Sequence, residues 1–122
     1  MHRILVVDDE PGVRHSFTKL LEREYLVDTA EDGASALEKI EMACPDLVFM
    51  DIKMPGISGM EALRRIKGSH PDIPVVMMTA HGDAQRAIEA IRDGAYDYLV
   101  KPLHTESVKD VIGKGLQARR VR

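Results

Sequence analysis

Short, unbroken apolar runs constrain the fold of this chain more than any other feature. Four of them are spread along the sequence, at residues 4–7, 47–50, 75–78 and 98–100. None alternates with polar residues, which is typical of strands covered on both faces, and such strands belong to parallel sheets. A weaker fifth run, residues 25–30, includes polar residues and predicts a strand nearer a sheet edge.

Helical periodicity fills the gaps between these runs. Apolar residues recur three or four positions apart within residues 13–21, 37–44, 60–66, 84–91 and 108–116. A strand followed by a helix, five times over with short loops, predicts an α/β fold. We expect a doubly wound, five-stranded parallel sheet with helices on both faces and right-handed crossovers.

Single residues refine this pattern. Asp83 is placed to cap the fourth helix, and Gly94 to end it. Cys44 closes the second apolar stripe, so we expect it in the core as a small apolar side chain. As the only cysteine, it excludes an internal disulfide.

Composition narrows the function classes. A chain of 122 residues suits one domain, and 44% hydrophobic with 30% charged residues is a globular composition. Acidic residues outnumber basic ones by 20 to 17, and there is no Trp, which disfavours a nucleic-acid-binding domain. No stretch fits a signal peptide or a membrane span, so we expect a cytoplasmic protein. The basic end, residues 119–122, is either a solvated helix end or the start of a linker.

Polar side chains follow the predicted strands at the points where they end. Asp8 and Asp9 come after the first run, Asp51 after the run 47–50, Thr79 after the next, and Lys101 after the last. Ligands of open parallel sheets bind beyond the carboxyl ends of the strands. We therefore expect three carboxylates, a hydroxyl and an ammonium group on one rim.

This combination is suited to phosphoryl transfer. Crowded carboxylates raise one another's pKa values, which a divalent cation would relieve, and oxygen ligands suit Mg²⁺. The ion and Lys101 would offset the charge of a phosphoryl group, Asp51 would be the nucleophile, and Thr79 would donate a hydrogen bond to a phosphoryl oxygen. Taken singly, each residue has an ordinary structural role, such as helix capping by Asp8 or Asp9.

Other functions fit less well. An aspartyl-nucleophile phosphatase would need a second acid two residues after its nucleophile on the first strand, whereas Asp8 and Asp9 are adjacent. A flavin mononucleotide binder would need a Ser-, Thr- or Gly-rich loop there, and a nucleotide-binding domain would need a G-x-x-x-x-G-K-[ST] run. The 5 His residues have no pair at ligand spacing on one helix, which disfavours zinc.

Four segments, in this order and spacing, make the chain similar to response regulator receiver domains of two-component signalling, the flavodoxin-like fold group of CheY. They are VVDDE at 6–10, MDIKMPG at 50–56, TAHG at 79–82 and GAYDYLVKP at 94–102. The resemblance covers residues 3–118 and implies the strand order 2-1-3-4-5. Residues 79–83 and 95–99 look most like receivers of the NtrC group, whose regulators carry ATPase and DNA-binding domains.

The resemblance also implies a metal and a phosphoacceptor. Asp51 matches the phosphoacceptor, and Lys101 the lysine that contacts the phosphoryl group. Asp9, Asp51 and the backbone carbonyl of Lys53 match the ligands of Mg²⁺, for which Mn²⁺ can substitute, while Asp8 acts largely through water.

A second set of matches concerns switching. Thr79 and Tyr98 match the switch pair, whose hydroxyl moves toward the phosphoryl group while the aromatic ring turns inward. Pro102 matches a proline that follows a cis peptide bond. Lys53 and His81 match positions that tune the rate of dephosphorylation.

The implied function is a phosphorylation-dependent signalling switch formed by residues 1–122 as a single domain. A sensor histidine kinase donates the phosphoryl group, and the surface of helix 84–91, strand 98–100 and helix 108–116 then controls an output domain, with a homodimer as one outcome. Such a domain is regulatory, although it catalyses its own phosphorylation and dephosphorylation, and it binds neither nucleic acid nor membrane. The alternative is a stand-alone phosphoaspartate relay protein without an output domain. Ile88, Ala90 and Ile91 either pack on the sheet or belong to the partner surface.

Overall fold

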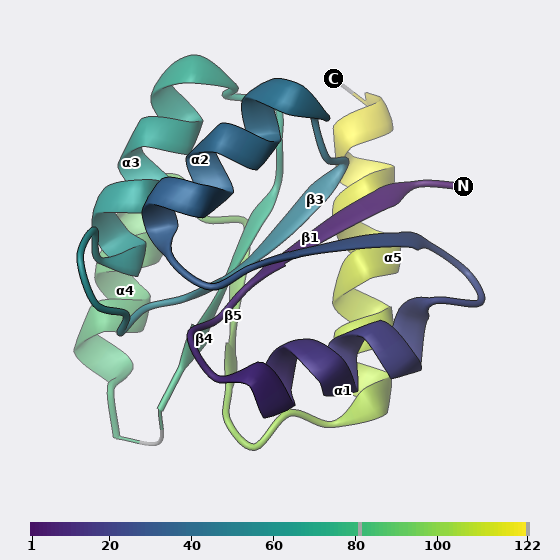
Figure 1. Cartoon of the computed structure of the whole chain (residues 1–122). Helices are drawn as coiled ribbons and strands as arrows, with labels where there is room; N and C mark the ends of the chain where they lie inside the picture. The colour runs from purple at the N-terminus through teal and green to yellow at the C-terminus, as the bar shows by residue number, and fades with distance from the viewer. Residues whose placement is uncertain (81, 122) are drawn as a thin grey trace.

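The computed structural model describes residues 1–80 and 82–121, with side chains through residue 119 (Figure 1). In these ranges five parallel strands form one sheet in the order β2-β1-β3-β4-β5, as predicted. The strands are β1 (Arg3–Val7), β2 (Leu26–Ala30), β3 (Leu47–Asp51), β4 (Val75–Thr79) and β5 (Asp97–Val100). The helices are α1 (Pro11–Leu21), α2 (Gly33–Met42), α3 (Gly59–Ser69), α4 (Ala84–Arg92) and α5 (Thr105–Val121). None of the helices so described is long and apolar enough to cross a membrane.

Helices cover both faces of the sheet, with α1 and α5 on one side and α2, α3 and α4 on the other (Figure 1). Each side has its own apolar core. On the α1–α5 side, the rings of Phe17 and Phe49 lie 4.9 Å apart between their centroids. All five residues of β3 and of β4 are buried, which confirms that these continuous apolar runs are central strands.

The two edges of the sheet differ from the middle. The expected edge position of β2 is confirmed, and Leu26 on it is exposed. For β5, the expectation of a strand covered on both faces was wrong. Tyr98 is 40% exposed and Val100 44%, because β5 is the other edge strand and its side chains alternate between a covered and an open face.

Two local predictions were also corrected. Helix α2 ends at Met42, so Cys44 lies beyond the helix and is exposed rather than in the core. Asp83 occupies the N-cap position of α4, but its side chain makes no capping hydrogen bond. Its Oδ2 atom is buried without a hydrogen-bond partner among the described residues. Gly94 follows the end of α4 with φ +105°, as a helix-terminating glycine does.

Candidate functional site

The carboxyl ends of four strands meet at one rim. Pairing places Val7 beside Met50, Asp51 beside Met78, and Thr79 beside Val100, so neighbouring strands end nearly level. Asp8 and Asp51 are therefore brought to the rim with Thr79, and these three are the buried polar or charged residues among those the structure describes. Asp9, the next residue after Asp8, is exposed.

A lysine joins two of the carboxylates. Lys101 Nζ lies 2.9 Å from Asp8 Oδ2 and 3.5 Å from Asp51 Oδ2. The other oxygen of Asp8, Oδ1, accepts a hydrogen bond from the backbone N–H of Glu10 at 3.0 Å, which fixes the turn between β1 and α1. The Lys101 backbone N–H donates to the carbonyl of Thr79 at 2.8 Å, and the Lys101–Pro102 peptide bond is cis.

A glycine lets α3 start directly against the phosphoacceptor candidate. A Cβ atom on Gly59 would lie 2.0 Å from the backbone oxygen of Asp51 and 2.7 Å from Cα of Ile52. Its N–H donates to the carbonyl of Ile52 at 2.9 Å, and the Ser58 hydroxyl caps the helix by accepting from the N–H of Glu61. The turn after β3 is thus closed tightly, and it holds Asp51 at the rim.

Burial and crowding change the acidity of the site. Burial raises the pKa of Asp51 from 3.8 to about 6, with the charges of Asp8 and Asp9 adding to the effect and Lys101 opposing it. Burial by itself would lower the pKa of Lys101, but its hydrogen bond to Asp8 and the charge of Asp51 outweigh burial and raise it. The rim therefore holds more negative charge than its one lysine balances.

The donor atoms fit a hard divalent cation. Carboxylate oxygens of Asp8, Asp9 and Glu10 lie within 4.8 Å of one another, and Asp51 contributes a further carboxylate with a raised pKa. An all-oxygen set with surplus negative charge suits Mg²⁺. Glu10 was not among the predicted ligands, although it directly continues the acidic run.

The remaining predicted residues lie around this cluster. The Thr79 hydroxyl donates to the carbonyl of Leu99 at 3.5 Å, at the long limit of a hydrogen bond. Tyr98 lies on β5 with its ring partly exposed, and Lys53 is exposed beside Asp9. His81 lies outside the described residues.

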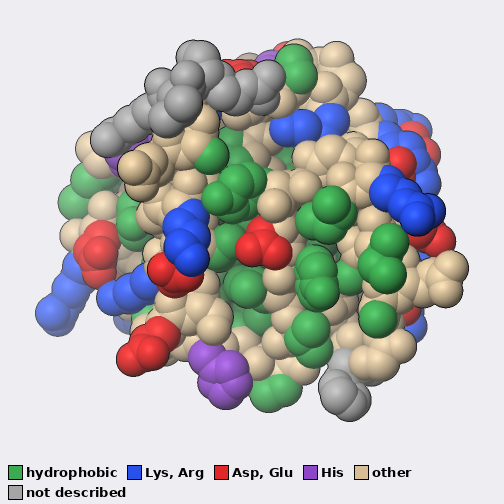
Figure 2. All heavy atoms as spheres, turned by 180° about the vertical axis from the view of Figure 1, so that it is seen from behind, with side chains coloured by type: hydrophobic (Ala, Val, Ile, Leu, Met, Phe, Trp, Pro, Cys, Tyr) green, Lys and Arg blue, Asp and Glu red, His purple; other side chains and the backbone are tan. Residues whose placement is uncertain are grey.

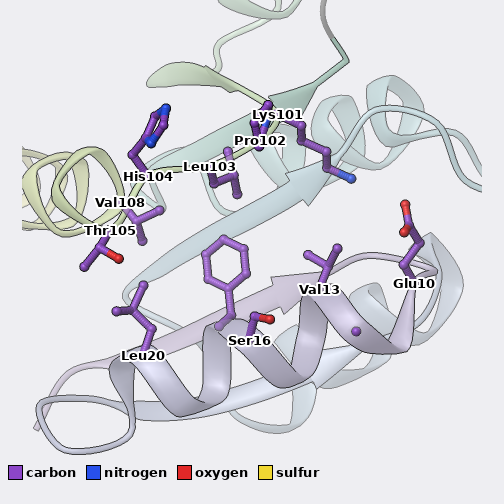
Figure 3. Close-up of a pocket in the computed structure, with 12 residues that line it drawn as sticks. Glu10, Val13, Ser16, Leu20, Lys101, Pro102, Leu103, His104, Thr105 and Val108 are labelled. Atoms are coloured by element: carbon purple, nitrogen blue, oxygen red, sulfur yellow. The ribbon is translucent and has the colours of Figure 1, made fainter.

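Two hollows adjoin the rim. One, of about 650 Å³, lies between α1 and the segment after β5, with Val13, Leu20 and Val108 on its apolar walls and Lys101 and Glu10 at one end (Figure 3). The other, of about 500 Å³, is lined by Asp9, Ile52, Lys53, Met54, Ser58 and Arg86. Arg86 was missed from the sequence, because only the folding of α4 beside the rim brings it there.

A doubly wound sheet that ends in this acidic, lysine-containing rim defines a receiver domain. Residues 4–113 match the family model described as the response regulator receiver domain, and the chain belongs to this family. The family is regulatory, and its members are phosphorylation-dependent switches of two-component signalling, which leaves the phosphatase alternative disfavoured.

Curated relatives of this chain include regulators of the predicted group. The chain is 40% identical to the nitrogen assimilation regulatory protein NtrX of Azorhizobium caulinodans, over 99% of this chain and 27% of NtrX. It is 37% identical to the DNA-binding transcriptional regulator NtrC of Escherichia coli, over 93% of this chain and 24% of NtrC. The structure matches that of a response regulator receiver domain protein from Clostridium thermocellum with a TM-score of 0.95, 35% identity, and coverage of 99% and 98%. The predicted likeness to NtrC-type receivers is confirmed, and the chain spans about a quarter of the length of NtrX and NtrC.

Proposed function

We propose that this domain accepts a phosphoryl group on Asp51 from a sensor histidine kinase and passes the signal to an output domain through α4, β5 and α5. The observation that carries the proposal is the position of Asp51. The Asp51 side chain is 11% exposed, its pKa is about 6, and its Oδ2 atom lies 3.5 Å from Lys101 Nζ. At neutral pH most of this carboxylate is ionised and can act as a nucleophile.

Each side chain of the site has a different proposed role in phosphoryl transfer. An oxygen of Asp51 forms a bond to phosphorus while the bond from phosphorus to the donor breaks, and the donor leaves with the electron pair. Lys101, held between Asp8 and Asp51, supplies a positive charge beside the phosphoryl oxygens. Mg²⁺ would be held by Asp9, Asp51 and the Lys53 carbonyl, with Asp8 and Glu10 close by, and would offset further negative charge.

The switch is proposed to begin at Thr79. Its hydroxyl is bonded only at 3.5 Å to Leu99, so little is lost when it turns to donate to a phosphoryl oxygen. Tyr98 lies two residues before Val100, the β5 partner of Thr79, and would turn inward into the space that the hydroxyl leaves. Phosphorylation then shifts the population between two states of this region.

The surface that changes is apolar and exposed. Ile88 and Ile91 on α4 are exposed, as are Tyr98 and Val100 on β5. Figure 2 shows hydrophobic side chains gathered on the rear face of the molecule, the side on which β5 lies. We propose that this surface meets the output domain, or a second copy after activation. The exposure of Ile88 and Ile91 favours a partner surface over packing on the sheet.

The kinase is proposed to approach the rim beside α1, away from the exposed apolar residues of α4 and β5. The hollow between α1 and the segment after β5 provides apolar walls next to Lys101 and Glu10 (Figure 3). A phosphohistidine-bearing helix that packs there would bring its phosphoryl group toward Asp51.

The wider context is proposed from the relatives. Because NtrX and NtrC are about four times longer and are regulators, we infer that residues 1–122 are one receiver domain and that residues 119–122 begin the link to a transcriptional output domain. Arg119 still lies within α5, where it pairs with Asp46 and Asp72. The cytoplasm is the proposed location, because such a regulator shares a compartment with DNA, although this domain itself is not expected to bind DNA or membrane.

The direct test is phosphorylation by a small donor. The domain and its Asp51→Asn variant are incubated with Mg²⁺ and acetyl phosphate and weighed intact. We expect the parent to gain one phosphoryl group only when Mg²⁺ is present, and the variant to gain none. If both gain it, the acceptor is another residue, and if neither does so, binding of beryllofluoride with Mg²⁺ distinguishes a slow donor from an inactive site.

A further inference from the structure

Arg86, in the first turn of α4, shares a hollow with residues of the acidic rim. The hollow has a volume of about 500 Å³, and its lining includes Asp9 after β1 and both Ile52 and Lys53 after β3. Because Ile52 directly follows Asp51, the hollow adjoins the proposed phosphoacceptor. An arginine from α4 is thereby brought to the region that a phosphodonor must enter.

The charged residues of this hollow favour an anion. Lys53 and Arg86 contribute two positive charges, against one negative charge from Asp9. Arg86 also forms an ion pair with Asp83, which is not part of this lining, and the 3.6 Å between Arg86 Nε and Asp83 Oδ1 is longer than a hydrogen bond, so the guanidinium can still donate hydrogen bonds to another anion. About half of the Arg86 side chain is exposed, and Lys53 is exposed too, so both can contact a bound molecule.

The geometry of phosphoryl transfer places Lys53 and Arg86 where they could contact the leaving group rather than the phosphoryl oxygens. Lys101 is already engaged with Asp8 and Asp51, where it would face the oxygens of a phosphoryl group on Asp51. In phosphoryl transfer the attacking and leaving oxygens lie roughly in line on opposite sides of phosphorus. The leaving group would therefore point away from Asp51, on the far side of the phosphorus atom from the attacking oxygen.

Resting on the proposed function, we propose that Arg86, together with Lys53, binds the carboxylate leaving group of small acyl phosphates and makes this domain favour them over donors with an uncharged leaving group. As an Asp51 oxygen bonds to phosphorus, the bond from phosphorus to the acyl oxygen breaks, and the electron pair leaves with the carboxylate. Negative charge grows on that carboxylate and no proton is transferred. The planar guanidinium of Arg86 can donate two parallel hydrogen bonds to its oxygens.

The test compares two donors on matched variants. Acetyl phosphate releases acetate, whereas phosphoramidate releases ammonia. The variants are Arg86→Gln, Arg86→Lys and the control Arg92→Gln, which removes one positive charge from the exposed last turn of the same helix. Initial rates at saturating Mg²⁺ are measured by intact mass, and circular dichroism checks that each variant is folded.

We expect Arg86→Gln to lower the acetyl phosphate rate at least about tenfold, the low end for loss of a charged hydrogen bond. The phosphoramidate rate should stay within about twofold of that of the parent. Arg86→Lys should recover part of the loss, and Arg92→Gln should change neither rate. Equal losses of rate for both donors would show that Arg86 attracts anions in general, and would overturn the contact with the leaving group. An unchanged acetyl phosphate rate would also overturn this contact. If the parent gains no phosphoryl group from either donor, this inference is overturned. The proposed function fails with it only if the parent also does not bind beryllofluoride with Mg²⁺, so the two failures are distinguishable.

Discussion

Replacing Asp51, the proposed phosphoacceptor, by asparagine should stabilise the fold at neutral pH. The pKa of Asp51 is about 6 in the folded domain, against 3.8 for the unperturbed side chain. Between these pH values the unfolded chain has released the proton while the folded chain still holds it. The free energy of unfolding therefore falls as pH rises through this window, and the full penalty applies above it. Asp51→Asn removes the ionisable group and keeps its shape.

The size of the effect follows from the shift. About two pKa units correspond to about 3 kcal/mol, which residual solvent access reduces, so we expect Asp51→Asn to add about 1–3 kcal/mol at pH 7.5 without divalent cations. At pH 4.5 the folded carboxylate is mostly protonated, and the gain should shrink to about one third. Saturating Mg²⁺ should also reduce this difference in the free energy of unfolding, because the ion binds the parent more tightly than it binds Asp51→Asn.

Urea denaturation followed by circular dichroism measures these differences, because the chain has no Trp for fluorescence. The control is Glu38→Gln, which removes one carboxylate from the exposed surface of α2 and should change stability by less than about 0.5 kcal/mol. A variant no more stable than the parent at pH 7.5 would refute a penalty from burial and charge crowding on the ionised Asp51. A gain of equal size at both pH values would show that ionisation of this carboxylate is not its source.

Three further predictions concern the same rim. Gly59→Ala should cost about 3 kcal/mol in urea denaturation, because the added Cβ would lie 2.0 Å from the backbone oxygen of Asp51; an unchanged midpoint would contradict this close approach. Mg²⁺ should bind about tenfold more weakly at pH 5 than at pH 7 by calorimetry, since protons compete for a carboxylate whose pKa is about 6; a pH-independent affinity would place the ion away from Asp51. Lys53→Ala should change the decay rate of the phosphorylated domain at saturating Mg²⁺, and the same decay rate as in the parent would rule out a role for this side chain.

The sequence was sufficient to predict the sheet and the rim because both depend on a strong local signal. Continuous apolar runs identify strands buried on two faces, and the residue after each run lies at the carboxyl edge of the sheet. Since Asp8, Asp51 and Lys101 each follow such a run, their positions in the sequence predict that they lie close together. Their 2.9 and 3.5 Å contacts are consistent with that placement.

Features that depend on where helices end, or on what lies across space, could not be predicted in this way. Periodicity extends past the last helical residue, which is why Cys44 appeared to belong to the core. The sequence of β5 is as apolar as that of a central strand, and only its edge position exposes Tyr98. Arg86 reaches the rim through the placement of α4, for which the sequence carries no local signal.

The free energy that Thr79 and Tyr98 would gain on switching can be compared with the free energy needed to shift the population from one state to the other. Moving the Thr79 hydroxyl from a 3.5 Å bond with a neutral carbonyl to a charged phosphoryl oxygen gains about 1 kcal/mol. Turning Tyr98 inward would bury its exposed 40%, about 80 Å² of an aromatic side chain, for about 2 kcal/mol. Together these give about 3 kcal/mol, or a shift of roughly two orders of magnitude in the ratio of the two states, whereas a change from 1:99 to 99:1 needs about 5.5 kcal/mol. The hydroxyl and the ring alone therefore would not make the domain all-or-none, and we expect the remainder to come from contacts that the α4–β5–α5 surface makes with its proposed partner. The exposed Ile88 and Ile91 provide apolar surface for those contacts.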